Sequence, residues 1–129
     1  MAKIRVFLTD DHTLFRQGIK TLVASEPDME PVGEASNAVD AIALAAEVKP
    51  DVVLMDIGMP GVSSFEATRQ IRKQEEESGR HLPILAMTAN AMEGDRERCL
   101  ESGMDDYLPK PVKQEALFEM IDRWAAHRA

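Results

Sequence analysis

Four short apolar segments of the sequence each end in a side chain that can handle metal or phosphate. Asp10 and Asp11 follow the first segment, Asp56 the second, Thr88 the third and Lys110 the fourth. Carboxylates can hold Mg²⁺, which prefers hard oxygen ligands, and an ionised Asp can attack phosphorus to form an acyl phosphate. An ammonium and a hydroxyl can bind phosphoryl oxygens. These residue types predict phosphoryl transfer to a carboxylate that needs no separate base.

Each of these residues has a commoner role when it is taken singly. Asp10 and Asp11 can begin a loop and cap a helix, Thr88 can end a strand, and Lys110 can lie on the surface. The chemical interpretation therefore depends on their convergence. Segments far apart in sequence would have to build one site.

Parallel strands that alternate with helices would bring these side chains to one edge of a sheet, where open α/β sheets place their ligands. Apolar runs predict strands at 3–9, 51–56, 83–88 and 104–108, and a weak strand is expected at 31–35. Apolar residues at helical spacing follow each of these segments. The segment 51–56 is the most apolar and is expected to be central. The pattern predicts an α/β fold, a doubly wound five-stranded parallel sheet with helices on both faces.

Three of the predicted helices have informative ends or compositions. Asn37 can cap the second helix, which Pro50 ends. The helix that begins near Ser64 runs into three glutamates at 75–77, which oppose its dipole, so we expect this end to fray into a mobile connection. The helix at about 90–101 has few large apolar residues and contains Gly94, so it is expected to move easily.

The composition is that of a globular protein of 129 residues, 44% hydrophobic and 29% charged. A net charge of -8 disfavours non-specific attraction to nucleic acid or anionic lipid, because their phosphates would be repelled. The single cysteine, Cys99, excludes an internal disulfide and a thiolate metal cluster. The apolar stretch before Asp10 is too short for a signal peptide or a spanning helix. We expect a cytoplasmic protein that neither binds nucleic acid directly nor inserts into a membrane.

Several motifs, correctly spaced over essentially the whole chain, resemble the receiver domain of two-component response regulators. They are Asp10-Asp11, Met55-Asp56-Ile57-Gly58-Met59-Pro60-Gly61, Met87-Thr88-Ala89 and Tyr107-Leu108-Pro109-Lys110-Pro111. The resemblance implies a single receiver domain over residues 1–129 with the flavodoxin-like strand order 2-1-3-4-5. It also implies a phosphoacceptor rather than an enzyme, one that catalyses only its own phosphorylation and slow dephosphorylation.

The resemblance assigns a metal site to the acidic residues. Asp56 would be the phosphoacceptor, and Asp11 and Asp56 would ligate Mg²⁺ together with the backbone carbonyl of Gly58. Asp10 would assist through water.

The resemblance also assigns the phosphoryl contacts and a switch. Thr88 and Lys110 would contact the phosphoryl group, and the Lys110–Pro111 peptide bond would be cis. Phosphorylation would move Thr88 and turn Tyr107 inward, which reshapes the face made by the fourth helix, the fifth strand and the fifth helix.

The implied partner is a sensor histidine kinase or a histidine phosphotransfer protein, which donates the phosphoryl group from a phosphohistidine. A phosphorylation-dependent dimer is compatible with the resemblance. The first half of the chain resembles receivers attached to DNA-binding regulators, and the second half resembles receivers of hybrid sensor kinases. The chain is therefore either a stand-alone receiver or one excised from a longer protein.

The chain departs from the usual receiver pattern in the loop after the phosphoacceptor. Ser63-Ser64 stands where an acidic or amide residue and a glycine are common, which predicts a different turn and a serine cap on the next helix. Gly58 replaces a larger side chain and leaves room for water beside the phosphoryl group. We expect Gly58 and Asn90 to influence the rate of hydrolysis.

Three other functions have requirements that can be compared with this sequence. A phosphatase of the haloacid dehalogenase type needs an acid two residues after its nucleophile, where this chain has Gly58. A pseudo-receiver that only binds a partner would not need the intact acids, Thr88 and Lys110. A flavin-binding protein would need a Ser/Thr-rich loop after the first strand. The scattered histidines His12, His81 and His127 show no metal-ligand spacing.

Overall fold

The computed structural model describes residues 3–59, 63–89 and 93–125. Strands and helices alternate along the chain. Their order is β1 (Ile4–Thr9), α1 (Thr13–Ser25), β2 (Met29–Ala35), α2 (Ala38–Val48), β3 (Val52–Asp56), α3 (Ser64–Ser78), β4 (Ile84–Thr88), α4 (Glu93–Ser102), β5 (Asp106–Pro109) and α5 (Gln114–Ala125).

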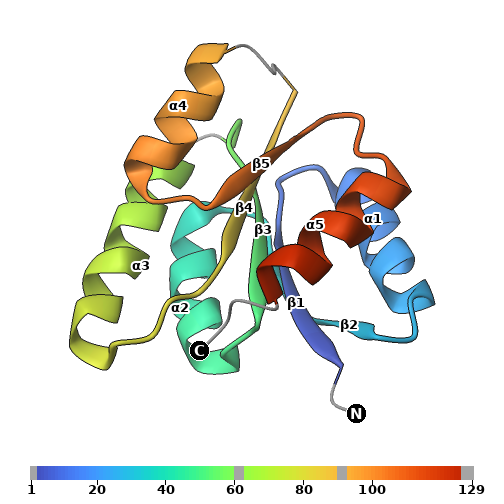
Figure 1. Ribbon diagram of the computed structural model, residues 1–129, viewed down its shortest axis with the longest axis horizontal. Coiled ribbons are helices and arrows are strands. Elements are labelled where there is room, and N and C mark those ends of the chain that lie inside the picture. Colours follow the sequence, from blue (N-terminus) through green and yellow to red (C-terminus); the bar gives the residue numbers. More distant parts are fainter. Residues whose placement is uncertain (1–2, 60–62, 90–92, 126–129) are drawn as a thin grey trace.

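The five strands form one parallel sheet in the order β2-β1-β3-β4-β5, with β3 at its centre (Figure 1). The predicted doubly wound fold, its strand order and the central position of the third strand are confirmed. Every side chain of β3 is buried, which explains why its segment is so apolar.

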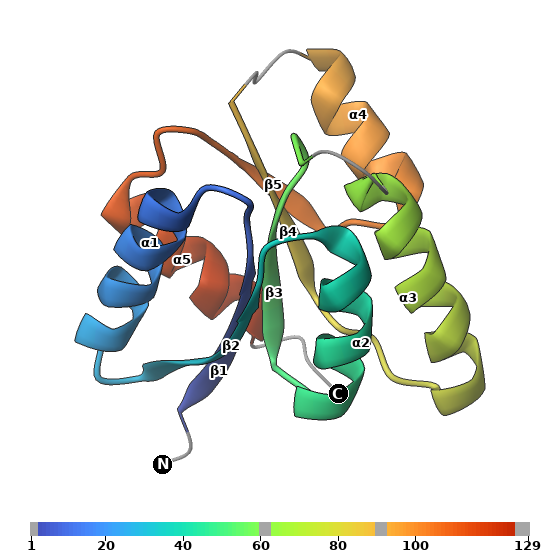
Figure 2. The same cartoon turned by 180° about the vertical axis from the view of Figure 1, so that it is seen from behind.

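Helices cover both faces of the sheet, and each face has its own core (Figures 1 and 2). Helices α1 and α5 lie on one face, and α2, α3 and α4 lie on the other. The first core joins Val6, Leu8, Ile19, Val23, Met29, Val52, Leu54, Leu85, Met87, Leu108, Leu117 and Ile121. The second joins Phe7, Ala35, Ala38, Ala41, Val53, Met55, Met59, Ala67, Ile71, Ile84, Ala86, Cys99 and Met104. Successive side chains of β1, β3 and β4 thus enter opposite cores.

Side-chain caps begin two of the helices as predicted. The side chain of Asn37 accepts a hydrogen bond from the backbone N–H of Asp40, at 2.8 Å, at the start of α2. The hydroxyl of Ser63 accepts one from the N–H of Glu66, at 3.1 Å, at the start of α3. The predicted serine cap is confirmed.

The end of α3 differs from the expected frayed terminus. The helix continues to Ser78, and Gly79 closes it in the left-handed conformation with φ of 73°. One of the three glutamates is bound locally, because Glu75 accepts hydrogen bonds from Arg72 and from the N–H of Leu82. These contacts offset the unfavourable position of Glu75 near the negative end of the helix dipole.

Helix α4 contributes little to the core, as its sequence predicts. From Arg96 to Ser102, only Cys99 and Ser102 are buried. Within the described part of the chain, no helix is long and apolar enough to cross a membrane.

Candidate functional site

The carboxyl edge of the sheet brings together the side chains predicted to do chemistry. Asp10 follows β1, Asp56 is the last residue of β3, Thr88 is the last residue of β4, and Lys110 follows β5. The ammonium of Lys110 lies 3.0 Å from Asp10 Oδ2 and 3.4 Å from Asp56 Oδ1. Residues 100 positions apart in the chain are therefore in direct contact.

Asp10 is completely buried, with 0% of its surface exposed. Its Oδ1 accepts the backbone N–H of His12 at 2.8 Å, and its Oδ2 accepts the ammonium of Lys110. Each carboxylate oxygen thus has a donor, which a buried charge requires. The bond to His12 closes the turn before α1, but the N-cap of α1 is His12 and no side chain caps the helix, so the simple capping role considered for Asp10 is not observed.

Asp56 is almost completely buried and lies in a site that disfavours its charge. Burial raises the pKa of the Asp56 carboxyl above its ordinary value; the N–H of Gly58, which donates to Oδ1 at 3.1 Å, lowers it. The neighbouring carboxylate of Asp10 raises the pKa further, and Lys110 opposes that effect. A cation bound beside Asp56 would favour its ionised form.

A group of four side chains at this edge could hold a metal ion. Asp10, Asp11, His12 and Asp56 each place one potential ligand atom within 4.8 Å of the others. Asp11 Oδ1 is buried and accepts no hydrogen bond from any described residue, although His12 Nδ1 lies 3.2 Å away. An unsatisfied carboxylate oxygen among three acids fits a hard divalent cation such as Mg²⁺.

Lys110 is held in place by an aromatic ring as well as by the acids. Its ammonium lies 4.3 Å from the centroid of the Phe15 ring, and its side chain is 16% exposed. Its peptide bond to Pro111 is cis, as the resemblance implies. The lysine can turn toward either acid without leaving this edge.

Gly58 combines a backbone contact with open space. A Cβ added to Gly58 would lie 3.6 Å from Asp56 Oδ1, an ordinary van der Waals distance. A Cβ therefore fits at this position without a clash, and glycine leaves the approach to Asp56 open.

Ser64 makes a contact that could not be predicted from the sequence. It is buried, and its hydroxyl donates a hydrogen bond to the backbone carbonyl of Asp56. Its own carbonyl accepts the hydroxyl of Thr68 at 2.8 Å. The serine pair thus has two tasks: Ser63 caps α3, and Ser64 connects α3 to the last residue of β3.

A cleft of about 450 Å³ opens above the end of β3. Its lining residues are His12, Asp56, Ile57, Gly58, Ser63, Phe65, Thr88, Ala89, Arg98 and Lys110. Thr88 is 2% exposed and lines the cleft together with Asp56. The predicted acceptor, hydroxyl and ammonium therefore share one opening.

Sequence reasoning missed three residues of the site. His12 appeared to be a scattered histidine, but it joins the acidic group because it directly follows Asp11. Phe65 and Arg98 come from α3 and α4, and the Arg98 guanidinium lies 4.8 Å from the Phe65 ring centroid at the cleft. Only the helix packing places these two beside the strand ends.

Tyr107 lies outside the set of residues that line the cleft. It is half-buried, packs against the second core, and has the Arg96 guanidinium 5.8 Å from its ring centroid. Asn90, which was expected with Gly58 to influence the rate of hydrolysis, lies outside the described residues, and so do Pro60 and Gly61.

Comparison with known proteins identifies a family that matches this geometry. The model of the response regulator receiver domain matches residues 6–122. The chain is 40% identical over 121 residues to hybrid signal transduction histidine kinase I of Dictyostelium discoideum, covering 92% of the chain. It spans 7% of that kinase and about half the length of several bacterial regulators that it matches.

Two solved structures are similar over nearly the whole chain. The receiver domain of sensor histidine kinase PA1611 from Pseudomonas aeruginosa, with magnesium in its active site cleft, has a TM-score of 0.84 and 35% identity and covers 97% of this chain and 99% of that one. The receiver domain of Ssk1 from Saccharomyces cerevisiae, in complex with the histidine phosphotransfer protein Ypd1, has a TM-score of 0.86 and 28% identity. That match covers 97% of this chain and 90% of the other.

Proposed function

The chain belongs to the response regulator receiver domain family, and we propose that Asp56 is the side chain on which it accepts a phosphoryl group. The observation that carries this proposal is the position of the Asp56 carboxylate. It lines the cleft together with Thr88, and its Oδ1 lies 3.4 Å from the Lys110 ammonium. No other described carboxylate lines this cleft.

The proposed reaction is a phosphoryl transfer from a phosphohistidine. One carboxylate oxygen of Asp56 attacks phosphorus, the P–N bond to the imidazole breaks, and its electron pair leaves with the imidazole. The product is an acyl phosphate on Asp56. The ammonium of Lys110 offsets negative charge on the phosphoryl oxygens, and the hydroxyl of Thr88 donates to one of them.

A divalent cation completes the charge balance of the site. Asp10, Asp11 and Asp56 offer the carboxylate oxygens, and the resemblance adds the backbone carbonyl of Gly58. Mg²⁺ held there would neutralise charge that develops on the phosphoryl oxygens. The unsatisfied Oδ1 of Asp11 and the magnesium in the cleft of the PA1611 receiver support this assignment.

The partner that we propose is a sensor histidine kinase or a histidine phosphotransfer protein. The Ssk1 receiver bound to Ypd1 supports a phosphotransfer partner, and the kinase relative supports a receiver that belongs to a phosphorelay. We further propose that the domain catalyses its own phosphorylation and its slow dephosphorylation. The net charge of -8 argues against direct contact with nucleic acid.

The output of the switch is proposed to be the face formed by α4, β5 and α5. Helix α4 is the weakly anchored element, because only two of its side chains from Arg96 to Ser102 are buried. Thr88 ends β4 directly before this region, so its movement toward a phosphoryl group would shift the start of α4 and the space around Tyr107. Phosphorylation-dependent dimerisation through this face would be one such output.

Phosphorylation by a small donor tests the proposed chemistry. The protein is incubated with acetyl phosphate and Mg²⁺, and intact mass spectrometry counts the phosphoryl groups. We expect one base-labile adduct that needs Mg²⁺ and is absent from Asp56→Asn. Continuous release of phosphate from a phosphate ester would instead indicate a phosphatase, and a protein that stays unmodified in Mg²⁺ would indicate a pseudo-receiver.

A further inference from the structure

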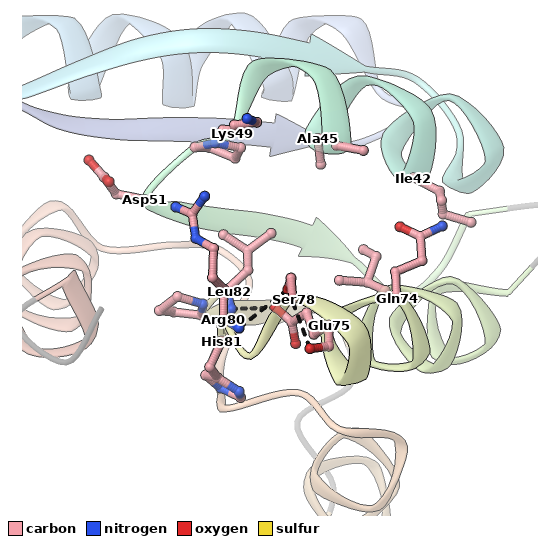
Figure 3. Close-up of a pocket in the computed structure, with 14 residues that line it drawn as sticks. Ile42, Ala45, Lys49, Asp51, Gln74, Glu75, Ser78, Arg80, His81 and Leu82 are labelled. Carbon is pink, nitrogen blue, oxygen red and sulfur yellow. Dashed lines mark hydrogen bonds between the residues drawn. The ribbon is translucent and has the colours of Figure 1, made fainter. Parts of the chain in front are cut away.

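A second cavity, of about 350 Å³, lies at the opposite edge of the sheet from the acidic site (Figure 3). Its walls are the end of α2, the end of α3 and the loops that lead into β3 and β4. The volume is within the range of small-molecule pockets, near its lower end. The carboxyl edge with Asp56 has no part in it.

The interior of this cavity is mainly apolar. Its apolar residues are Ile42, Ala45, Ala46, Pro50, Ile71, Leu82 and Pro83. Four of these, Ala45, Pro50, Ile71 and Pro83, are themselves buried, so they form a firm floor. The loop wall is fixed as well, because Leu82 donates its N–H to Glu75 and its carbonyl accepts Arg72 at 2.8 Å. The cavity is therefore a formed feature with an apolar interior.

Two cations stand at the mouth of the cavity. Lys49 lies at the end of α2 and Arg80 in the loop after α3, and both are exposed. In Figure 3 the guanidinium of Arg80 points toward the wall that carries Lys49 and Asp51. Among the described residues, no carboxylate forms an ion pair with the ammonium of Lys49 or with this guanidinium.

The acids that line the cavity are engaged with other groups. Glu75 is paired with Arg72 at 2.6 Å, and it also binds the loop. Asp51 accepts the backbone N–H of Arg5 at 2.8 Å. The charges around the mouth of the cavity therefore favour the binding of an anion, although the whole chain carries a net charge of -8.

The backbone of Lys49 is held in a conformation that a lysine rarely adopts. Its φ is 55° and its ψ is 62°, in the left-handed region. Its N–H donates to the carbonyl of Ala45 at 3.0 Å, and its carbonyl accepts the Arg5 guanidinium at 2.7 Å. The base of the Lys49 side chain is thus fixed at the rim.

We propose that this cavity binds a small molecule with an apolar body and a single anionic group. The body would occupy the space above Ala45, Ile71 and Leu82, and the anion would lie between Lys49 and Arg80. Without a bound divalent cation, the acidic cluster at the other edge of the sheet would repel a carboxylate, so a metal-free titration distinguishes the two sites. This site is independent of the phosphoacceptor chemistry.

A titration with three matched probes tests the charge preference. The probes are 4-phenylbutanoate, 4-phenylbutanamide and 4-phenylbutylamine, which differ only in the charge of the head group. Each is added to ¹⁵N-labelled protein, and amide shifts are followed by NMR. We expect saturable shifts at the amides of Ala45, Lys49 and Leu82, with the carboxylate bound most tightly and the amine least.

Substitutions test the contribution of the two cations to binding separately from that of the apolar interior. Lys49→Gln with Arg80→Gln should weaken the carboxylate about tenfold and leave the amide unchanged, since each exposed pair contributes only modestly. Lys73→Gln with Lys113→Gln removes two exposed cations that do not line the cavity, and should change neither affinity. Thermal unfolding of both double variants checks that they are folded.

Several results would overturn the proposal. Equal affinity of the carboxylate and the amide would show an apolar cavity without a site for an anion. Shifts that do not saturate, or that lie around Asp11 and His12, would show that the probe does not bind in this cavity.

Discussion

The buried hydroxyl of Ser64 donates a hydrogen bond to the backbone carbonyl of Asp56. This contact joins the first residue of α3 to the last residue of β3, eight positions earlier in the chain. The residue proposed to accept phosphate is thereby connected to a helix whose far end lines the second cavity. The roles of Ser63 and Ser64 can be distinguished by experiment.

Ser64→Ala should destabilise the fold and slow phosphorylation. It leaves a buried carbonyl without its donor, which costs about 1–3 kcal/mol. Ser63→Ala is the matched control, because it removes only the cap of α3, at a cost of about 1 kcal/mol. Urea unfolding measures the stabilities, and the acetyl phosphate reaction measures the rates. If Ser63→Ala slowed phosphorylation as much as Ser64→Ala, the positioning role of Ser64 would be wrong.

Asp56→Asn should stabilise the metal-free protein at neutral pH. Because burial raises the pKa of Asp56 in the folded state, its ionised form is less favourable in the fold than in the unfolded chain. The cost is present above the folded pKa and fades as the pH falls through it toward the unfolded value. Asn can still accept the Gly58 N–H. Thermal unfolding at several pH values should show an advantage for Asn that shrinks in acid; an advantage that grows in acid would contradict this account.

Lys110→Gln should bind Mg²⁺ more tightly and yet accept phosphate more slowly. The ammonium of Lys110 lies 3.0 Å from Asp10 and 3.4 Å from Asp56, so it competes with a cation for both acids. Even at the dielectric constant of bulk water, one charge at such a separation contributes about 1 kcal/mol, or roughly fivefold in affinity. Calorimetric titration with Mg²⁺ measures the affinity. Weaker binding of Mg²⁺ by the variant would show that Lys110 supports the metal site instead.

Gly58→Met should slow the loss of phosphate from the phosphorylated protein. The backbone has room for a Cβ at 3.6 Å from Asp56 Oδ1, so the new side chain can shield the phosphoryl group from water without unfolding the loop. The half-life of the phosphorylated form, followed by mass spectrometry after removal of acetyl phosphate, is the measurement. Gly18→Met, on an exposed position of α1 with open space around it, serves as the control. An unchanged half-life would remove Gly58 as a determinant of hydrolysis.

Most of the sheet was predictable because β1, β3 and β4 are short, nearly continuous apolar runs that end in a polar residue. The segment of β2, which contains Glu30, Pro31 and Gly33, gave only a weak signal. The burial of both faces of β3 is the direct consequence of Val52, Val53, Leu54 and Met55 in succession. Asn37 and Ser63 were also predictable, since a cap acts on residues only three positions away. Contacts between residues that are close in the chain can be predicted from the sequence.

Contacts between distant segments were less predictable. Nothing in the sequence shows that Lys110 donates to Asp10 and lies slightly farther from Asp56, because the choice depends on the spacing of β1, β3 and β5. The carbonyl partner of Ser64 depends on how α3 leaves β3. The second cavity is built from two separate segments, 42–51 and 71–83, so no single motif predicts it.

The central claim is that the phosphoryl group is placed on Asp56. Borohydride reduces an acyl phosphate on Asp to homoserine, and peptide mass spectrometry then locates the modified residue. After reaction with acetyl phosphate and Mg²⁺, we predict homoserine at position 56 alone and none in the absence of Mg²⁺. Homoserine at position 10 or 11, with Asp56 unmodified, would contradict the claim.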